Sequence, residues 1–253
     1  MNVELEDTAA DLHLLKRPRY EEPGLRGTGY LDPEPAKEAK LWFDDGSVYL
    51  IAEGKPFLVH RSILSYHSLV FHDTFKIPQP QTVVDHINGI PVVQLSDLWN
   101  VVKYFLTAIY YVQEYLHPDV TRPFSEVSAL LHLATKYQAD SIRKEAIRRL
   151  IIWFPSNLKE FARSPAIRWT EELDEFDVQD LELSGVHKWD AIAAVNLARS
   201  MDVPEILPPA FYVCANLPIE TLFKGHTDKN GRLHRLSVDD VKLCLSGKEK
   251  LSQ

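Results

Sequence analysis

The chain has 253 residues, of which 45% are hydrophobic and 25% are charged, a composition typical of globular proteins rather than of disordered, fibrous or membrane proteins. The formal net charge of -8 and the pI near 5.7 argue against nucleic-acid binding, because such binding depends on clustered Lys and Arg that neutralise phosphate. No apolar run approaches the roughly 18 residues that a membrane span requires, so we expect a soluble intracellular protein with two packed units.

Residues 1–38 are predicted to form a flexible arm, because they carry four prolines, three glycines and no sustained apolar period. Lys16, Arg17 and Arg19 make a short basic cluster in this arm. Such a cluster in an exposed segment is typical of nuclear import signals, although short basic runs also arise by chance. Both readings stay open.

Short strands are predicted directly after the arm. Residues 41–43 form an aromatic strand that ends at a tight turn over residues 44–46, where Asp and Gly tolerate the required backbone angles. Residues 48–52 and 57–59 are apolar and predict a hairpin. A further short buried strand is predicted over residues 92–95.

Helices are predicted to follow these strands. Beyond His60 the apolar period changes from two to about 3.6 residues, which predicts two short helices ending near Phe75. Three more are predicted where apolar residues share one face, over residues 99–109, 127–134 and 142–151. Since strands come first and helices cluster after them, the order favours an α+β fold, a small mixed sheet capped by helices, over a doubly wound α/β fold.

A domain boundary is predicted at Phe154 and Pro155, because proline removes a backbone donor and disfavours helical angles in the residue before it. The chain then divides into the arm (1–38), a first domain (39–154) and an α-helical extension (155–253). Within the extension, the apolar pattern predicts helices over residues 157–163, 189–201, 204–216 and 238–245.

A run at the end of the hairpin carries a resemblance to a known family. It reads Phe57-Leu58-Val59-His60-Arg61-Ser62-Ile63-Leu64, continues to Ser68 and Phe71, and is followed by Phe75. This run resembles the hallmark of the BTB/POZ domain. Residues 92–97, 102–110 and 130–138 are similar to the family's later strand and helices, in the correct order, and the last contains Ala134, Lys136 and Tyr137. Residues 42–46, 78–80 and 206–208 look like the fungal branch of the family.

The resemblance implies a non-enzymatic protein–protein interaction module. Self-association is expected through the apolar surface of residues 41–75, while the third helix or the extension engages another protein. Some family members are adaptors of cullin-type ubiquitin ligases, and a nuclear regulatory factor is the alternative, so the cytoplasm, the nucleus or both are expected locations. The residues predicted to make protein contacts are Leu41, Trp42, Phe43, Asp45, Tyr66 and His67.

The strength of self-association is predicted from the arm. Many BTB dimers exchange an amino-terminal strand and helix, whereas this arm is Pro-rich and mostly polar, so the exchanged element is expected to be missing or shortened to residues 40–43. Stable interfaces bury on the order of 1,200–2,000 Å² in total. The sequence therefore predicts a homodimer of modest strength.

A third reading, from another functional class, is a metal-dependent hydrolase built on the histidines of the first domain. His60 is instead expected to fix the strand-to-helix junction by bonding a nearby carbonyl or acid, because no Ser-His-Asp arrangement accompanies it. His60, His67 and His72 lack the i, i+4 spacing that places zinc ligands on one helix face. No catalytic residue, metal or cofactor is therefore predicted.

The extension offers two further candidate features. Cys214, His226, His234 and Cys244 are too irregularly spaced for a zinc site, and the two cysteines predict free thiols in a reducing compartment. Residues 171–182 are acidic, which predicts a solvated loop, but interleaved apolar residues would also suit docking on a basic partner groove. These docking residues would be Leu173, Phe176, Val178 and Leu181.

Overall fold

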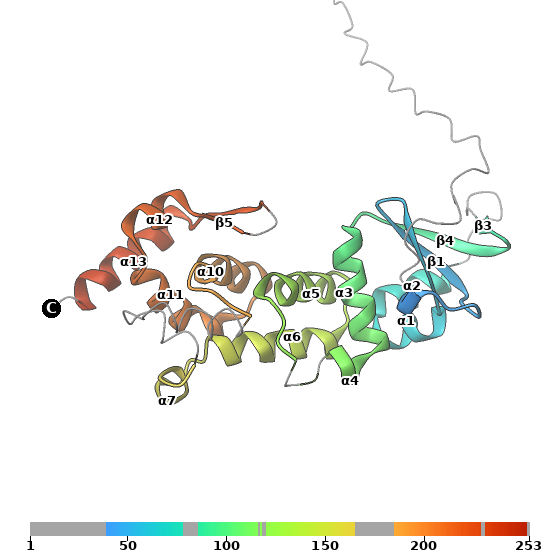
Figure 1. The fold of residues 1–253 in the computed structure, drawn as a ribbon, viewed down its shortest axis with the longest axis horizontal. Helices are drawn as coiled ribbons and strands as arrows, with labels where there is room; N and C mark the ends of the chain where they lie inside the picture. The colour runs from blue at the N-terminus through green and yellow to red at the C-terminus, as the bar shows by residue number, and fades with distance from the viewer. Residues whose placement is uncertain are drawn as a thin grey trace, which may run out of the picture. The chain divides into compact units, whose positions relative to one another are not determined.

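A computed structural model describes residues 39–77, 86–115, 117, 120–164, 185–228 and 231–251. It contains a four-stranded mixed sheet in the order β2-β1-β4-β3 (Figure 1). The central strand β1 pairs antiparallel with β2 and parallel with β4. The strands are β1 (Val48–Ala52), β2 (Lys55–Val59), β3 (His86–Ile87) and β4 (Ile90–Leu95).

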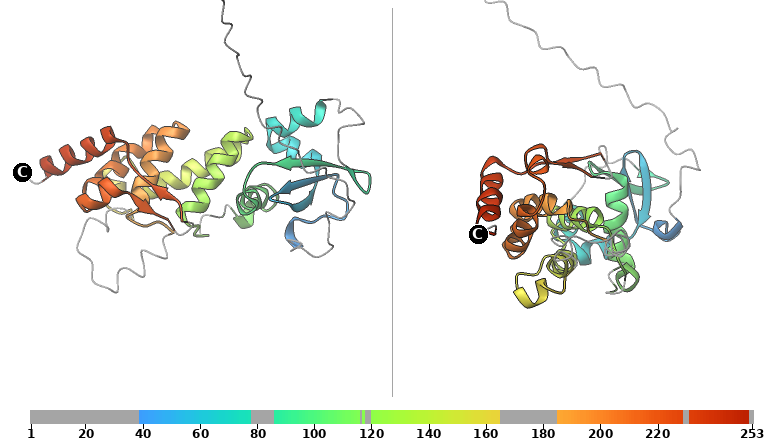
Figure 2. Two further views of the ribbon diagram at one scale, coloured as in Figure 1. Left: turned by 90° about the horizontal axis from the view of Figure 1, so that it is seen from above. Right: turned by 60° about the vertical axis from the view of Figure 1, so that its left-hand side comes forward.

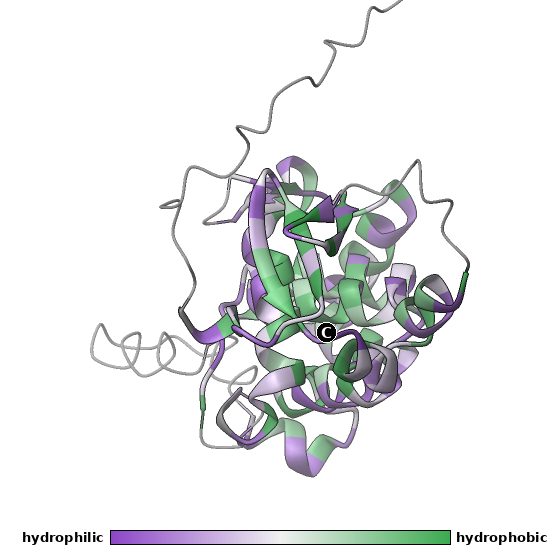
Figure 3. Cartoon of the chain, turned by 90° about the vertical axis from the view of Figure 1, so that its right-hand side faces the viewer, coloured by the Kyte–Doolittle hydropathy of each residue, from purple (hydrophilic) through white to green (hydrophobic). Residues whose placement is uncertain are grey.

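The predicted hairpin between β1 and β2 is confirmed, but β2 begins at Lys55, two residues earlier than predicted. Its two turn residues, Glu53 and Gly54, have φ angles of 49° and 74°, the positive values that a two-residue hairpin turn requires and that glycine adopts without strain. Apolar side chains of β1 point into the core, as the uninterrupted apolar run indicates. Figure 3, which faces the sheet, shows hydrophobic colouring along these central strands.

The strand predicted over residues 41–43 is wrong. Leu41 instead belongs to a short 3-10 helix, η1 (Ala39–Leu41). The next residue, Trp42, makes one isolated parallel bridge to Leu58. The backbone N–H of Phe43 then donates to Leu58 O at 3.0 Å, and the N–H of Gly46 donates to Phe43 O at 2.8 Å, which closes the turn. The turn is confirmed, but it begins too soon after the bridge for a strand to form.

The helical layer of the first domain is confirmed. Ser68 separates the first two helices, and its side chain accepts a hydrogen bond from Phe71 N–H as an N-cap. Apolar positions spaced three and four apart face the core from the longer helices. The helices are α1 (Arg61–His67), α2 (Leu69–Lys76), α3 (Trp99–Tyr110), α4 (Val112–Tyr115), α5 (Phe124–Lys136) and α6 (Asp140–Trp153).

The extension is mainly helical, as predicted, with a small hairpin in addition. Figure 2 shows α13, in red, at the edge of this part. Its elements are α7 (Leu158–Phe161), α10 (Asp190–Met201), η2 (Pro204–Ile206), α11 (Leu207–Ala215), α12 (Ile219–Lys224), β5 (His226–Thr227), β6 (Leu233–His234) and α13 (Val238–Leu251).

Several elements differ from the prediction. The helix predicted to end at residue 245 continues to Leu251, and a Cβ at Gly247 would be in ordinary van der Waals contact with Ala215 of α11, at 3.8 Å. The short elements β3, α4, α12, β5 and β6 were not predicted, since two to six residues carry too little periodicity to detect. The α+β class, with a small mixed sheet, capping helices and a helical extension, is confirmed.

The hydrophobic core continues across the predicted boundary at Phe154 and Pro155. Buried apolar residues form one cluster from Leu41 through α3, α5 and α6 to Cys244 in α13. Helix α10 packs on α5, and η2 packs on α6. Two polar contacts also join the parts: Phe124 N–H donates to Gly185 O at 2.6 Å, and Arg143 Nη2 donates to Met201 O at 2.8 Å.

Candidate interaction surfaces

His60 lies where β2 passes into α1, and its contacts are structural. Its backbone N–H donates to Tyr110 Oη at 2.7 Å, and its Nε2 lies 3.1 Å from Asp45 Oδ1. The Phe43 ring stacks on Tyr110 at a centroid distance of 4.8 Å and contacts the His60 ring at 4.9 Å. The prediction that a nearby acid fixes this histidine is confirmed, and the acid is Asp45.

Tyr110 is the half-buried tyrosine of this junction. Burial raises its pKa to about 12, although the hydrogen bond from the His60 backbone opposes that shift. The phenol therefore stays protonated at neutral pH. Its oxygen accepts the hydrogen bond from the His60 backbone and so holds the turn into α1.

Ser68 and Tyr137 form a second internal contact. Ser68 Oγ donates to Tyr137 O at 2.5 Å while it caps α2. The Tyr137 ring stacks on Phe71 at 4.8 Å, nearly parallel at 8°. The hallmark serine and phenylalanine thus bind α2 to the end of α5.

Asp97 explains why Lys136 and Tyr137 occur together. Lys136 Nζ lies 2.7 Å from the Asp97 carboxylate, and Tyr137 Oη donates to the same group at 2.6 Å. Burial raises the pKa of Tyr137, and its hydrogen bond to Asp97 raises it further. These residues fasten the segment after β4 to the end of α5, so their chemistry is used inside the fold.

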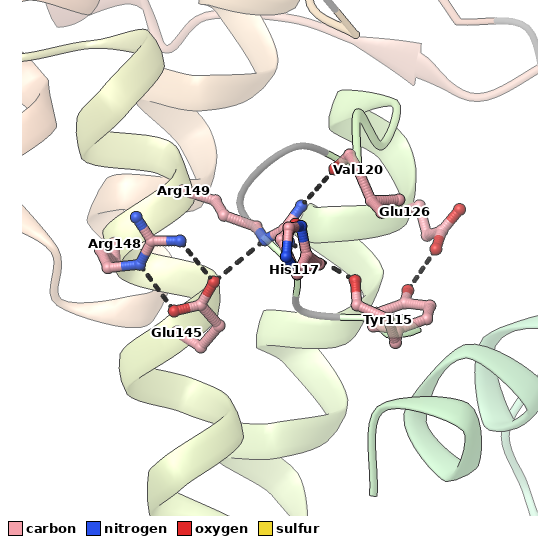
Figure 4. A network of polar contacts seen from close by, with 7 residues as sticks. All are labelled: Tyr115, His117, Val120, Glu126, Glu145, Arg148 and Arg149. Atoms are coloured by element: carbon pink, nitrogen blue, oxygen red, sulfur yellow. Dashed lines mark hydrogen bonds and ion pairs between the residues drawn. The ribbon is translucent and has the colours of Figure 1, made fainter. Parts of the chain in front are cut away.

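A buried arginine holds the chain between α4 and α5 (Figure 4). Arg149 has a 9% exposed side chain and pairs with Glu145 at 3.1 Å. Its guanidinium also donates to the carbonyls of His117 and Val120, both at 3.0 Å, and of Tyr115 at 3.4 Å. One side chain of α6 thereby satisfies three carbonyls that no helix or strand pairs.

Glu145 is shared by two arginines. Arg148 Nε lies 2.7 Å from one carboxylate oxygen, and Arg149 Nε lies 3.1 Å from the other. Burial alone would raise the pKa of Glu145, but the hydrogen bonds and charges of Arg148 and Arg149 lower it. Glu145 is therefore ionised at neutral pH and fixes the Arg149 side chain.

Tyr115 and Glu126 complete the network of Figure 4. Tyr115 Oη donates to the buried Glu126 carboxylate, and the Arg122 guanidinium covers the Tyr115 ring at 4.2 Å. Burial raises the pKa of Tyr115, and the hydrogen bond to Glu126 adds to the shift. The network therefore anchors α4, which the sequence did not reveal.

The polar residues above are used internally, whereas apolar residues of α1 and α2 face solvent. Tyr66 is 85% exposed, Leu69 52% and Ile77, just after α2, 61%. The Tyr66 ring meets His67 edge-on at 5.0 Å, and burial lowers the pKa of His67. We call Tyr66, His67, Leu69 and Ile77 the α1–α2 face. Exposed apolar groups gathered on adjacent short helices are typical of protein-contact surfaces.

A second exposed group surrounds the start of α3. The Lys55 ammonium lies 4.9 Å from the Trp99 ring and the Lys103 ammonium 5.5 Å from it, while the neighbouring Leu98 is 56% exposed. We call Lys55, Leu98, Trp99 and Lys103 the α3 patch. The sequence placed a candidate partner surface on the third helix but not this group of residues, because β2 and α3 bring together residues that lie far apart in the chain.

The six predicted contact residues fall into four groups. Leu41 is buried at 1% exposure and supports the surface from beneath. Trp42 and Phe43 are half-buried, with Trp42 edge-on to Tyr49 at 5.9 Å. Asp45 is exposed and bonded to His60 at the start of α1, whereas Tyr66 and His67 lie in the last turn of that helix, about 9 Å further along its axis.

The candidate histidines and cysteines do not converge on one site: Cys214 and Cys244 lie beside each other, and His226 pairs with His234 across the β5–β6 hairpin. His60 contacts Asp45, and His72 Nδ1 lies 3.0 Å from Asp73 Oδ1. Among the described residues, no group of three or more His, Cys, Asp or Glu side chains could hold a metal ion. Cys214 and Cys244 are free thiols, as predicted, and both are buried.

Other predicted features lie outside the described residues: the arm with its Lys16–Arg19 cluster, residues 78–80 and the acidic residues 171–182. None of the helices in the described part of the chain is long and apolar enough to cross a bilayer.

Comparison with known families agrees with the hallmark residues. The model of the BTB/POZ domain matches residues 43–151. No curated protein matches the chain. The described fold fits an α+β BTB domain with a helical extension. BTB domains are generally non-enzymatic folds that mediate protein–protein interactions and often form homodimers.

Proposed function

We propose that the chain is a non-enzymatic interaction scaffold that self-associates through its BTB/POZ domain and presents a second surface to another protein. The match over residues 43–151 carries this proposal. The internal use of the polar hallmark residues supports it, since His60, Asp97 and Tyr137 all bond within the fold. Function in this domain is therefore assigned to its exposed apolar and aromatic residues.

Self-association is proposed to use the α1–α2 face together with Trp42, Phe43 and Asp45. Tyr66 suits the centre of such a contact, because it is 85% exposed and aromatic side chains carry much of the energy of interfaces. Leu41 is buried next to Trp42 in the chain, and the Trp42 ring packs edge-on against Tyr49. Substituting Tyr66 should weaken the dimer without unfolding the chain, since the side chain contributes little to the core.

The test is sedimentation velocity over a concentration series, with the wild type compared with Tyr66→Glu and with Trp42→Ala/Phe43→Ala. We expect a dimer at micromolar concentration that Tyr66→Glu weakens about tenfold, which corresponds to about 1.4 kcal/mol. Lys144→Glu, an exposed change on α6, is the matched control. A wild-type monomer at high micromolar concentration would overturn self-association, and a dimer indifferent to these residues would place the interface elsewhere.

The α3 patch is proposed to bind the second partner, a cullin-type ubiquitin ligase scaffold. Leu98 offers exposed apolar area beside the lysines that flank Trp99. Purified cullin-type scaffolds should bind the wild type and lose affinity for Leu98→Asp. Binding that is unchanged in Leu98→Asp, or absent in the wild type, would refute this role and favour the nuclear regulatory factor.

Location in the cytoplasm, the nucleus or both, and kinship with the fungal branch, stay predictions. A fluorescent fusion tests the first. Replacing Lys16, Arg17 and Arg19 with alanine should reduce nuclear accumulation if the basic cluster is an import signal. Equal distribution of both forms would mean that the cluster is incidental.

A further inference from the structure

An apolar groove runs between α11 and α13. It encloses about 320 Å³, and its lining is mainly apolar. Phe211, Tyr212 and Ala215 line it from α11, and Leu243, Gly247 and Lys250 line it from α13. The small residues Ala215 and Gly247 face each other across a close helix contact. Two helices with small residues between them form the shape that receives a third helix.

The composition of the two helices indicates that the groove is an interface. Helix α11 (Leu207–Ala215) has no charged residue, and a helix that is apolar all round is normally buried. Nevertheless, Phe211 and Tyr212 are only half-buried. On the facing helix, Leu243 is 55% exposed and Leu251 54% exposed. Both walls thus present apolar area that the described residues do not cover.

The charges of α13 are arranged to fit a second α13 running in the opposite direction. At about 100° per residue, Asp239, Leu243, Ser246 and Lys250 fall within about 60° of one another, so they form one stripe at the rim of the groove. Acidic residues lie in the first turn of the helix and basic residues in the last. An antiparallel partner therefore brings opposite charges together at both ends.

The spacing of this stripe is self-complementary. The midpoint between Asp239 and Lys250 is also the midpoint between Leu243 and Ser246. A two-fold axis through this point therefore places residue 239 of one copy opposite residue 250 of the other, and residue 243 opposite residue 246. Asp239, whose carboxylate lies 3.1 Å from Lys242 Nζ of its own helix, then also faces Lys250 of the second copy. Leu243 faces Ser246 of the second copy, next to Gly247, where the small residues leave room for a leucine side chain.

We propose that the α11–α13 groove binds a second copy of this chain through antiparallel pairing of the two α13 helices. The contact is isologous, because the same residues serve on both sides. It is separate from the self-association proposed for the α1–α2 face and does not depend on it.

Charge reversal tests this contact directly by sedimentation velocity, carried out in full-length Tyr66→Glu so that the α1–α2 face contributes least. Asp239→Lys and Lys250→Glu should each weaken the dimer about tenfold, since every dimer then holds two like-charge pairs. An equimolar mixture of the two variants should regain the original affinity. Each mixed dimer sets the introduced lysine against the introduced glutamate at one end and keeps the original pair of Asp239 and Lys250 at the other.

Two further variants serve as controls. Glu249→Lys makes the same charge change as Asp239→Lys at an exposed position about 90° around the helix, and should leave the affinity unchanged. Leu243→Arg should abolish the dimer while preserving the melting temperature, because the side chain is more than half exposed.

A monomer at every concentration would overturn the proposal. Failure of the mixture to associate more tightly than its components would overturn the antiparallel register. The affinity regained by the mixture depends only on the charge pairs between the two α13 helices. This test can therefore succeed even if the α1–α2 face makes no dimer, and it can fail even if that face does.

Discussion

The first domain is marked by the internal bonds of its hallmark polar residues, and the extension by a groove lined with apolar residues. In residues 43–151, the hallmark polar groups bond inward, as the Asp97 carboxylate does with Lys136 and Tyr137. In the extension, α11 has no charge and α13 exposes Leu243 and Leu251. The polar residues of the hallmark thus hold the fold together, whereas the candidate contact surfaces consist of apolar residues that are exposed to solvent.

The largest expected effect concerns the core of the first domain. Leu131→Asp should unfold it, at a cost of several kcal/mol, because Leu131 is fully buried on α5 and an unpaired carboxylate cannot be accommodated there. Thermal unfolding followed by circular dichroism measures the loss. Ser125→Asp, exposed in the first turn of α5, should melt as the wild type does. A cooperative wild-type transition in Leu131→Asp would show that this face is not core.

The next effect separates two adjacent arginines. Arg149→Met should cost about 3 kcal/mol, because it leaves three carbonyls and Glu145 without their buried donor. Arg148→Met, whose side chain is 46% exposed, should cost less than about 1 kcal/mol. Urea unfolding of both variants gives the comparison. Equal losses would mean that the network of Figure 4 does not hold the chain between α4 and α5.

A smaller effect is expected at the junction of β2 and α1. Tyr110→Phe should cost about 1.5 kcal/mol, since the His60 backbone N–H loses its acceptor in a partly buried site. Asp45→Ala removes an exposed partner of His60 and should cost about 0.5 kcal/mol. The same urea measurement decides between them, and a larger loss for Asp45→Ala would make the ion pair the main support of the junction.

The smallest effect is a pH dependence. The pKa of Glu145 is lowered in the folded chain, so its pairs stabilise the fold above the ordinary pKa of 4.5 and lose that contribution as the pH falls through the lowered value. At pH 7 the free energy of unfolding of the wild type should be about 1 kcal/mol larger than that of Glu145→Gln. The difference should shrink in urea unfolding below pH 4.5, and a constant difference would contradict the pairing.

The sequence predicted the parts of the fold that repeat a pattern. The hairpin of β1 and β2 follows from uninterrupted apolar runs around Glu53 and Gly54, and the longer helices follow from their apolar faces. Residues 41–43 were predicted wrongly, because aromatic residues favour strands while hydrogen bonds to Leu58 limit this segment to one bridge. The strand propensity of single residues carries no information about these contacts with a distant segment.

The surfaces were less predictable than the fold. The acid that binds His60 could be expected, but its identity as Asp45 depends on the path of the chain. The partners of Arg149 are backbone carbonyls, which carry no sequence signal. Likewise, the α3 patch exists only because β2 places Lys55 over Trp99. Contacts between distant segments therefore set the limit of sequence reasoning.

The core that continues past Phe154 has a practical consequence for partner searches. Helix α10 covers part of α5, η2 covers part of α6, and Arg143 donates to Met201 O across this contact. A bait shortened to residues 39–154 would uncover apolar area that the whole chain keeps from solvent. Proteins captured on that area would be false positives, so the full chain is the appropriate bait.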